Sequence, residues 1–105
     1  MIFASDGPLR TNITANGYNQ SRMEVQIEEN KPVTIECKSH SEPPALYNIQ
    51  LNGRQLNTDN SVGSVTIDRM QISDEGDYIC VASNPKLGTS EQRKIKILVA
   101  SKGFA

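Results

Sequence analysis

The sequence has no tryptophan, a single histidine and only two cysteines among its 105 residues. None of its apolar runs approaches the ~20 residues that a membrane-spanning helix needs. Its 11 basic and 12 acidic side chains leave a net charge of −1. Without a basic excess to displace counterions, nucleic-acid binding is not expected. Histidine, cysteine and carboxylate side chains do not cluster at ligand spacing, so neither a metal site nor a cofactor is expected.

Enzymatic chemistry is not expected either. His40 stands beside Ser39, Ser41 and Glu42, but consecutive side chains on a strand or turn point apart and cannot form a catalytic triad. We therefore expect His40 to be a solvated loop residue, and the chain to have no catalytic residues.

The length fits one domain and leaves no room for a second core. The opening residues MIFAS are too short for a signal peptide, so Met1 is expected to be a start added for expression. We expect residues 1–8 to be a linker or an expression-derived segment, 9–100 to form the domain, and 101–105 to link it to a following domain.

Short alternating runs of apolar and polar residues lie between closely spaced turn residues, and no longer stretch has a helical period. Short strands at this spacing are typical of an all-β sandwich or barrel. Period-two phasing assigns these residues to inward faces: Met23, Val25 and Ile27; Val33, Ile35 and Cys37; Tyr47, Ile49 and Leu51; Val65 and Ile67; Gly76, Tyr78, Cys80 and Ala82; Ile95, Ile97 and Val99.

Both cysteines, Cys37 and Cys80, fall on inward phases. They are too few for a structural zinc site and too far apart for a redox pair, which leaves two buried thiols or one disulfide. The shared phase favours a disulfide between two sheets. Closing a loop of about 43 residues, it would contribute roughly 4 kcal/mol and indicate an oxidising compartment.

The run DEGDYIC, Asp74 to Cys80, resembles the D-x-G-x-Y-x-C motif of the immunoglobulin fold. The resemblance implies a tyrosine corner, in which the hydroxyl of Tyr78 bonds to a backbone group just upstream. Gly76 would allow the tight exit from the turn, and Ser73 or Asp74 would cap the short helical turn before it.

Other segments extend the resemblance over roughly residues 9–99. KPVTIEC resembles strand B, with Asn30 where a glycine usually stands, and asparagine tolerates the left-handed conformation required there. Val65, Ile67 and Met70 have the spacing of strand E, and CVASNPKLG resembles I-set domains. SEPPALY and NGRQL are similar to constant-type domains of carcinoembryonic-antigen-related adhesion molecules.

Two departures from the family pattern modify the expected architecture. Ile49 stands at the position of the usual strand C tryptophan, which predicts a smaller core around the disulfide. Only eight residues separate Leu56 from Val65, too few for a full strand D with its turns. We expect strands A, B and E in one sheet against G, F, C and a short C′ in the other, with D short or absent.

The outward positions of the two sheets differ. Strands A, B and E present charged and hydroxyl groups. The G-F-C face mixes apolar with polar residues, which indicates either ordinary surface apolarity or an adhesive face. The candidate binding residues are Asn48, Gln50, Ile79, Val81, Lys94, Lys96 and Leu98.

Two further surface features carry hypotheses. Asn12 and Asn19 begin glycosylation sequons. Arg93, Lys94 and Lys96 form a basic stripe on strand G. We expect this stripe to be a solvated edge rather than a binding site for a heparin-like polyanion, because Glu91 is adjacent and lysines commonly protect edge strands.

The resemblance implies an extracellular, non-catalytic module of a multidomain cell-surface adhesion or recognition protein. Its partners would be other proteins, including a second copy, and neighbouring domains of its own chain, with no nucleic acid and no membrane insertion. The alternatives are a structural I-set spacer of an intracellular muscle-type scaffold and an ectodomain module of a receptor kinase.

Overall fold

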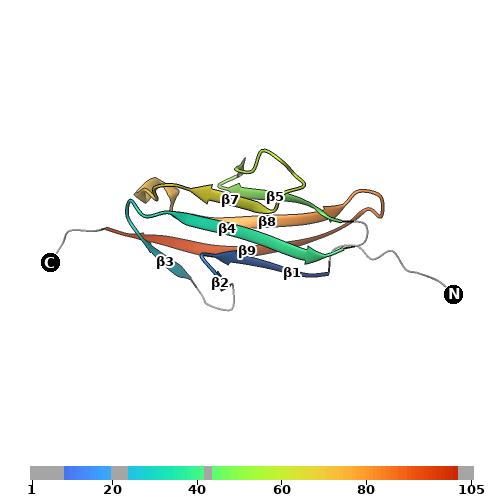
Figure 1. The fold of residues 1–105 in the computed structure, drawn as a ribbon, viewed down its shortest axis with the longest axis horizontal. Helices are drawn as coiled ribbons and strands as arrows, with labels where there is room; N and C mark the ends of the chain where they lie inside the picture. The colour runs from blue at the N-terminus through green and yellow to red at the C-terminus, as the bar shows by residue number, and fades with distance from the viewer. Residues whose placement is uncertain (1–8, 20–23, 42–43, 102–105) are drawn as a thin grey trace.

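The structure is a computed structural model, which describes residues 9–19, 24–41 and 44–101. Two β-sheets pack face to face, so the predicted all-β sandwich is confirmed (Figure 1). The four-stranded sheet has the order β2 (Tyr18–Asn19), β1 (Leu9–Ala15), β4 (Val33–His40), β7 (Ser64–Ile67). The five-stranded sheet has the order β3 (Val25–Glu28), β9 (Thr89–Ala100), β8 (Gly76–Asn84), β5 (Leu46–Leu51), β6 (Arg54–Gln55).

These sheets match the predicted grouping, with β1, β4 and β7 as A, B and E, and β9, β8, β5 and β6 as G, F, C and C′. The first strand of the fold is split between the sheets. β1 pairs antiparallel with β4, whereas β3 pairs parallel with β9, from Val25 opposite Ile97 to Glu28 opposite Ala100. Of the phased residues, Met23 lies outside the described part of the chain.

In the described chain, the segment between β6 and β7 contains no strand where strand D would lie. Within this segment, the side chain of Asn57 instead bonds to the backbone of β5, next to the short pairing of β5 with β6. Its Oδ1 accepts a hydrogen bond from the backbone N–H of Ile49 at 2.9 Å, and its Nδ2 donates to the carbonyl of Tyr47 at 2.8 Å. One buried amide therefore satisfies backbone groups of β5 that another strand would otherwise pair.

The predicted disulfide is confirmed. Cys37 on β4 and Cys80 on β8 are joined across the two sheets, with an S–S distance of 1.97 Å. Ile49 is fully buried and pairs with Cys80 in the strand register. The phasing identified most of the core correctly, but it omitted Ile13 and Ala15 of β1, which are fully buried.

The turn before β8 has the geometry that a tyrosine corner requires. The hydroxyl of the fully buried Tyr78 donates to the backbone carbonyl of Asp74, the last residue of the 3₁₀ helix η1 (Ile72–Asp74). The carboxylate of Asp74 accepts a hydrogen bond from the backbone N–H of Gln71 at 2.9 Å and so caps this helix. Gly76 has φ of 148°, and a Cβ there would stand 3.2 Å from Cδ1 of Leu51.

Candidate functional site

The candidate site is the outer face of the five-stranded sheet, built on three adjacent strands. β8 lies in the middle, with β5 on one side and β9 on the other. The antiparallel register forms two cross-strand rows. They are Asn48, Val81 and Gln92, followed by Gln50, Ile79 and Lys94.

The two rows have an apolar centre and polar flanks. Ile79 and Val81 are half-buried on the central strand, as are their β5 neighbours Asn48 and Gln50. On the β9 side, Lys94 is exposed. An apolar centre with a polar rim is the general arrangement of protein–protein interfaces, although this centre consists of only two side chains.

The structure places two predicted members of this face away from its centre. Lys96 lies opposite Asp77, one row beyond Lys94. Leu98 lies beyond the last β8–β9 pair and beside Gln26 of β3. Leu46, which the sequence analysis did not select, continues the face at the other end, opposite Ser83, and is 37% exposed. Its signal was the shared outward phase of Leu46 and Asn48.

The Asn48 side chain is committed to the fold. Its Nδ2 donates to Oε1 of Gln55 at 3.0 Å, and Nε2 of Gln55 donates in turn to Oδ1 of Asn60 at 2.9 Å. Oδ1 of Asn48 is buried and has no hydrogen-bond partner among the residues that the structure describes. Asn48 therefore braces the β5–β6 edge, whereas the amides of Gln50 and Gln92 on this face are not part of that network.

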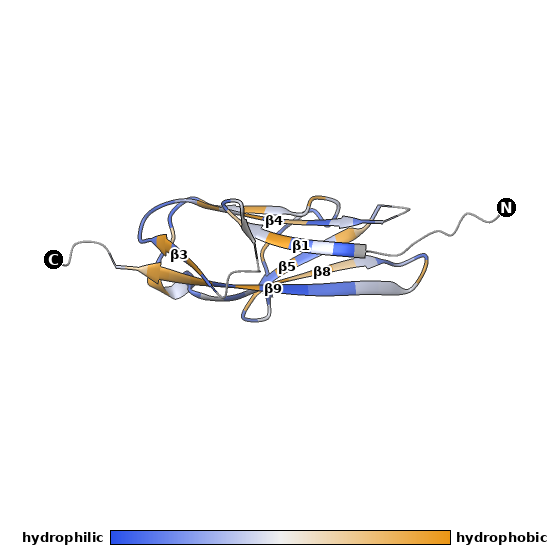
Figure 2. Cartoon of the chain, turned by 90° about the horizontal axis from the view of Figure 1, so that it is seen from below, coloured by the Kyte–Doolittle hydropathy of each residue, from blue (hydrophilic) through white to orange (hydrophobic). Residues whose placement is uncertain are grey.

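The predicted basic stripe on β9 is not a single surface. Arg93 pairs with inward-facing Cys80, so it points to the opposite side of the sheet from Lys94 and Lys96. Its guanidinium lies 3.7 Å from the carboxylate of Glu91. Two hydrogen bonds from Thr11, with Arg93 nearby, hold the pKa of the Glu91 carboxyl below its ordinary value. Alternation along one strand therefore separates these cations between the two sides of the sheet. Figure 2 shows that the middle portion of β9 is hydrophilic.

The outer face of the four-stranded sheet is polar. Its centre is a Thr34–Thr66 pair with hydroxyl oxygens 3.2 Å apart, and Glu36, Lys38 and Asp68 are exposed around it. Asn12 of the first sequon is exposed on this face. The second sequon includes Gln20 and Ser21, which lie outside the described residues.

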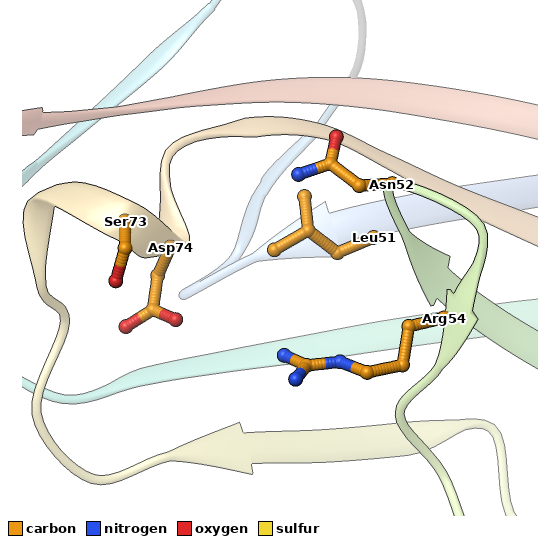
Figure 3. A pocket seen from close by; sticks show the side chains of 5 residues that line it. All are labelled: Leu51, Asn52, Arg54, Ser73 and Asp74. Carbon is orange, nitrogen blue, oxygen red and sulfur yellow. The ribbon is translucent and has the colours of Figure 1, made fainter.

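A recess of about 360 Å³ lies between the β5–β6 turn and η1. Figure 3 shows Arg54 and Asp74 facing it from opposite sides. The recess therefore contains one positive side chain, Arg54, and one negative side chain, Asp74. The Asp74 carboxylate is already engaged in capping η1.

Three further features concern the single histidine, possible metal ligands and possible membrane-spanning helices. His40, predicted to lie in a loop, is instead the last residue of β4, because its backbone pairs with Leu9, and its side chain is exposed. Among residues 9–19, 24–41 and 44–101, no three histidine, cysteine or carboxylate side chains gather where a metal could bind. No helix in these residues is long and apolar enough to cross a membrane.

Comparisons with known proteins agree with this geometry. Hemicentin-1 of Homo sapiens is 36% identical over 74 residues, which cover 65% of this chain and 1% of that protein. Contactin-5 of Danio rerio is 29% identical over 85 residues, covering 77% of this chain and 8% of that protein. Cell adhesion molecule CEACAM16 of Rattus norvegicus is 26% identical over 99 residues, covering 94% and 23%. The chain thus spans a small part of each relative.

Solved structures show the same fold at low sequence identity. The insect immune protein hemolin matches with a TM-score of 0.65 and 22% identity, covering 74% of this chain and 22% of that one. A titin M10–obscurin-like 1 complex matches with a TM-score of 0.64 and 18% identity, covering 77% and 88%. The family model for the immunoglobulin domain matches residues 14–84. With its two sheets and their connecting disulfide, the chain belongs to the immunoglobulin domain family.

Proposed function

We propose that this chain is a non-catalytic module of a multidomain extracellular adhesion or recognition protein. It acts by protein–protein contact through the outer face of the five-stranded sheet. The observation that carries the proposal is the contrast between the two outer faces. Ile79 and Val81 offer apolar area at the centre of one, whereas the other offers hydroxyl and charged groups, whose desolvation would offset most of the Coulomb gain.

The disulfide supports the extracellular assignment, because such bonds persist in oxidising compartments and are rare in the cytosol. The relatives support the adhesion role, since one of them is named a cell adhesion molecule. The hemolin structure is described in terms of homophilic adhesion, so a second copy of this chain is a reasonable partner to test first.

The path of the chain supports a place in a tandem array. β1 begins at one end of the long axis and β9 ends at the other, so the chain enters and leaves at opposite poles (Figure 1). Residues 9–100 would then form the module, leaving 1–8 and 101–105 as connecting segments. Neighbouring modules along this axis would leave both sheet faces open.

The apolar centre is small, so one module should bind weakly and gain strength from many copies. The test is therefore multivalent. Beads coated with the chain are scored for aggregation with each other and for adhesion to cells. An Ile79→Asp, Val81→Lys variant should fold yet lose adhesion in both assays.

The matched control carries the same charge change on the other face, Thr66→Asp with Thr34→Lys, at two neutral, outward-facing positions that pair across β4 and β7. It should adhere like the parent chain. Undiminished adhesion by the Ile79 and Val81 variant, or equal loss by both variants, would exclude this face as the contact site.

A second candidate is a structural spacer in an intracellular muscle-type scaffold. It is favoured by the titin match and by smooth muscle myosin light chain kinase of Gallus gallus, which is 23% identical over 79 residues. The intact mass of the chain from its natural source, before and after reduction and glycosidase treatment, distinguishes the two. A reduced, unglycosylated chain would favour the spacer.

A further inference from the structure

A second recess, on the outer face of the four-stranded sheet, gathers positive charge. Its volume is about 330 Å³, and Arg10, Asn12, Lys38, Ser39 and His40 line it. The first two residues come from β1 and the others from β4. The register pairs Asn12 with Lys38 across the two strands, and the backbone of Leu9, the neighbour of Arg10, pairs with that of His40.

The cations of this recess are not neutralised within the described chain. The ion pair found there joins Arg93 to Glu91, and none within 4 Å involves Arg10 or Lys38. Among the described residues, the lining of this recess includes no carboxylate, and Glu36 lines a neighbouring recess together with Lys38 and Asn12. In a chain with a net charge of −1, this local excess marks a site complementary to an anion.

The backbone of β1 is irregular at the same place. The register shifts between Leu9 and Asn12, so β1 carries an extra residue relative to β4. Arg10 within this bulge has φ of 54°, which is uncommon for a residue with a side chain. Bulges of this kind often re-aim a side chain near functional sites. On β4, the backbone N–H of Ser39 donates a hydrogen bond to the hydroxyl oxygen of Tyr47, with 3.2 Å between nitrogen and oxygen.

We propose that this recess binds the sulfate and carboxylate groups of an acidic polysaccharide. The Arg10 guanidinium can take an oxyanion through two parallel hydrogen bonds, and Lys38 can add a point charge. The amide of Asn12 also lines the recess and suits the hydroxyls of a sugar ring. Disulfides persist in oxidising, extracellular compartments, where an acidic polysaccharide rather than a nucleic acid is the polyanion to test.

The inference goes beyond the proposed protein contact and uses the opposite face of the sandwich. It also moves the polyanion hypothesis from β9, where Arg93 is separated from its neighbours and paired with Glu91, to β1 and β4. Asn12 lines the recess and begins a sequon, so a glycan on Asn12 would occupy the same space. Binding should therefore belong to the form without that glycan.

The test measures affinity for heparin by titration and its dependence on salt. The chain without glycans should bind, and Arg10→Glu with Lys38→Glu should weaken binding by roughly tenfold or more, since each lost charged contact is strong. Lys94→Glu with Lys96→Glu is the matched control on β9, with the same change in net charge. It should bind within about twofold of the parent, because its cations lie outside the recess. Circular dichroism and the intact disulfide establish that both variants fold.

Two further measurements test whether the recess recognises a polysaccharide rather than a free anion, and whether the Asn12 glycan blocks it. Inorganic sulfate at matched ionic strength should compete far less well than heparin, and a chain glycosylated at Asn12 should bind more weakly. Equal loss in the β9 variant, full binding by the Arg10 and Lys38 variant, competition by inorganic sulfate as strong as by heparin, or unchanged binding with the Asn12 glycan would each overturn the proposal.

Discussion

The inner and outer faces of the five-stranded sheet are built by the same strands but serve different ends. On β8, Cys80 faces inward next to Ile49 and is fully buried, while its neighbour Ile79 faces outward next to Gln50 and is half-buried. The inner face holds the disulfide and the closed core, so it should dominate stability. The outer face should contribute less to stability, and it is the face through which we propose that the module binds a partner. Substitutions on each face should separate folding from binding.

Among the substitutions on the inner face, removal of the disulfide should lower the free energy of unfolding the most. Cys37→Ala with Cys80→Ala is expected to lower the free energy of unfolding by about 4 kcal/mol, because the unfolded chain regains the entropy of an open loop. Urea denaturation of the parent and the variant measures the loss. A loss below about 1 kcal/mol would show that the rest of the core suffices.

A larger side chain should be tolerated on the outer face of the five-stranded sheet but not on its inner face. Ile49→Trp restores the residue usual in the family, yet Ile49 is fully buried, and overpacking typically costs about 1–3 kcal/mol. Ile79→Trp is the matched control on the outer face and should change stability by less than about 0.5 kcal/mol. A raised melting temperature for Ile49→Trp would show that the inner face holds a cavity.

The tyrosine corner lies at the end of the inner face. Tyr78→Phe removes the hydroxyl that donates to the carbonyl of Asp74, and should cost about 0.5–1.5 kcal/mol in chemical denaturation. The adhesion of the folded variant should not change, because the hydroxyl does not reach the outer face. No shift in the denaturation midpoint would contradict a stabilising role for this hydrogen bond.

The ionisation of the same hydroxyl should make the stability of the domain depend on pH over a narrow range. Burial, with the charge of Asp74 second, raises the pKa of Tyr78 from 10.0 to about 12. Because the folded state holds this proton more tightly than the unfolded state, its contribution is fully present below the unfolded pKa. It should be lost as the pH rises from about 10 to about 12. Tyr78→Phe should flatten stability over this window, and an unchanged slope would contradict the assignment.

Much of the inner face could be predicted because period two is a local property of a strand. Val33, Ile35 and Cys37 alternate with polar residues, and so do Ile95, Ile97 and Val99, so their burial followed from phase. Asn30 likewise has the left-handed conformation predicted for it, with φ of 68°. The outer face was harder to predict, because phase alone does not show which outward residues become neighbours. Leu98 and Ile79 share a direction but not a row.

The sequence by itself determined the strand phases, the disulfide and the corner at Tyr78, because each depends on short spacing or on a motif. Tertiary structure alone decided that β3 pairs with β9, that the Asn57 side chain satisfies backbone groups of β5, and that Arg10 and His40 line one recess. These features depend on which strands meet and in what register. Residues far apart in the sequence settle that through packing and hydrogen bonding, which no local pattern encodes.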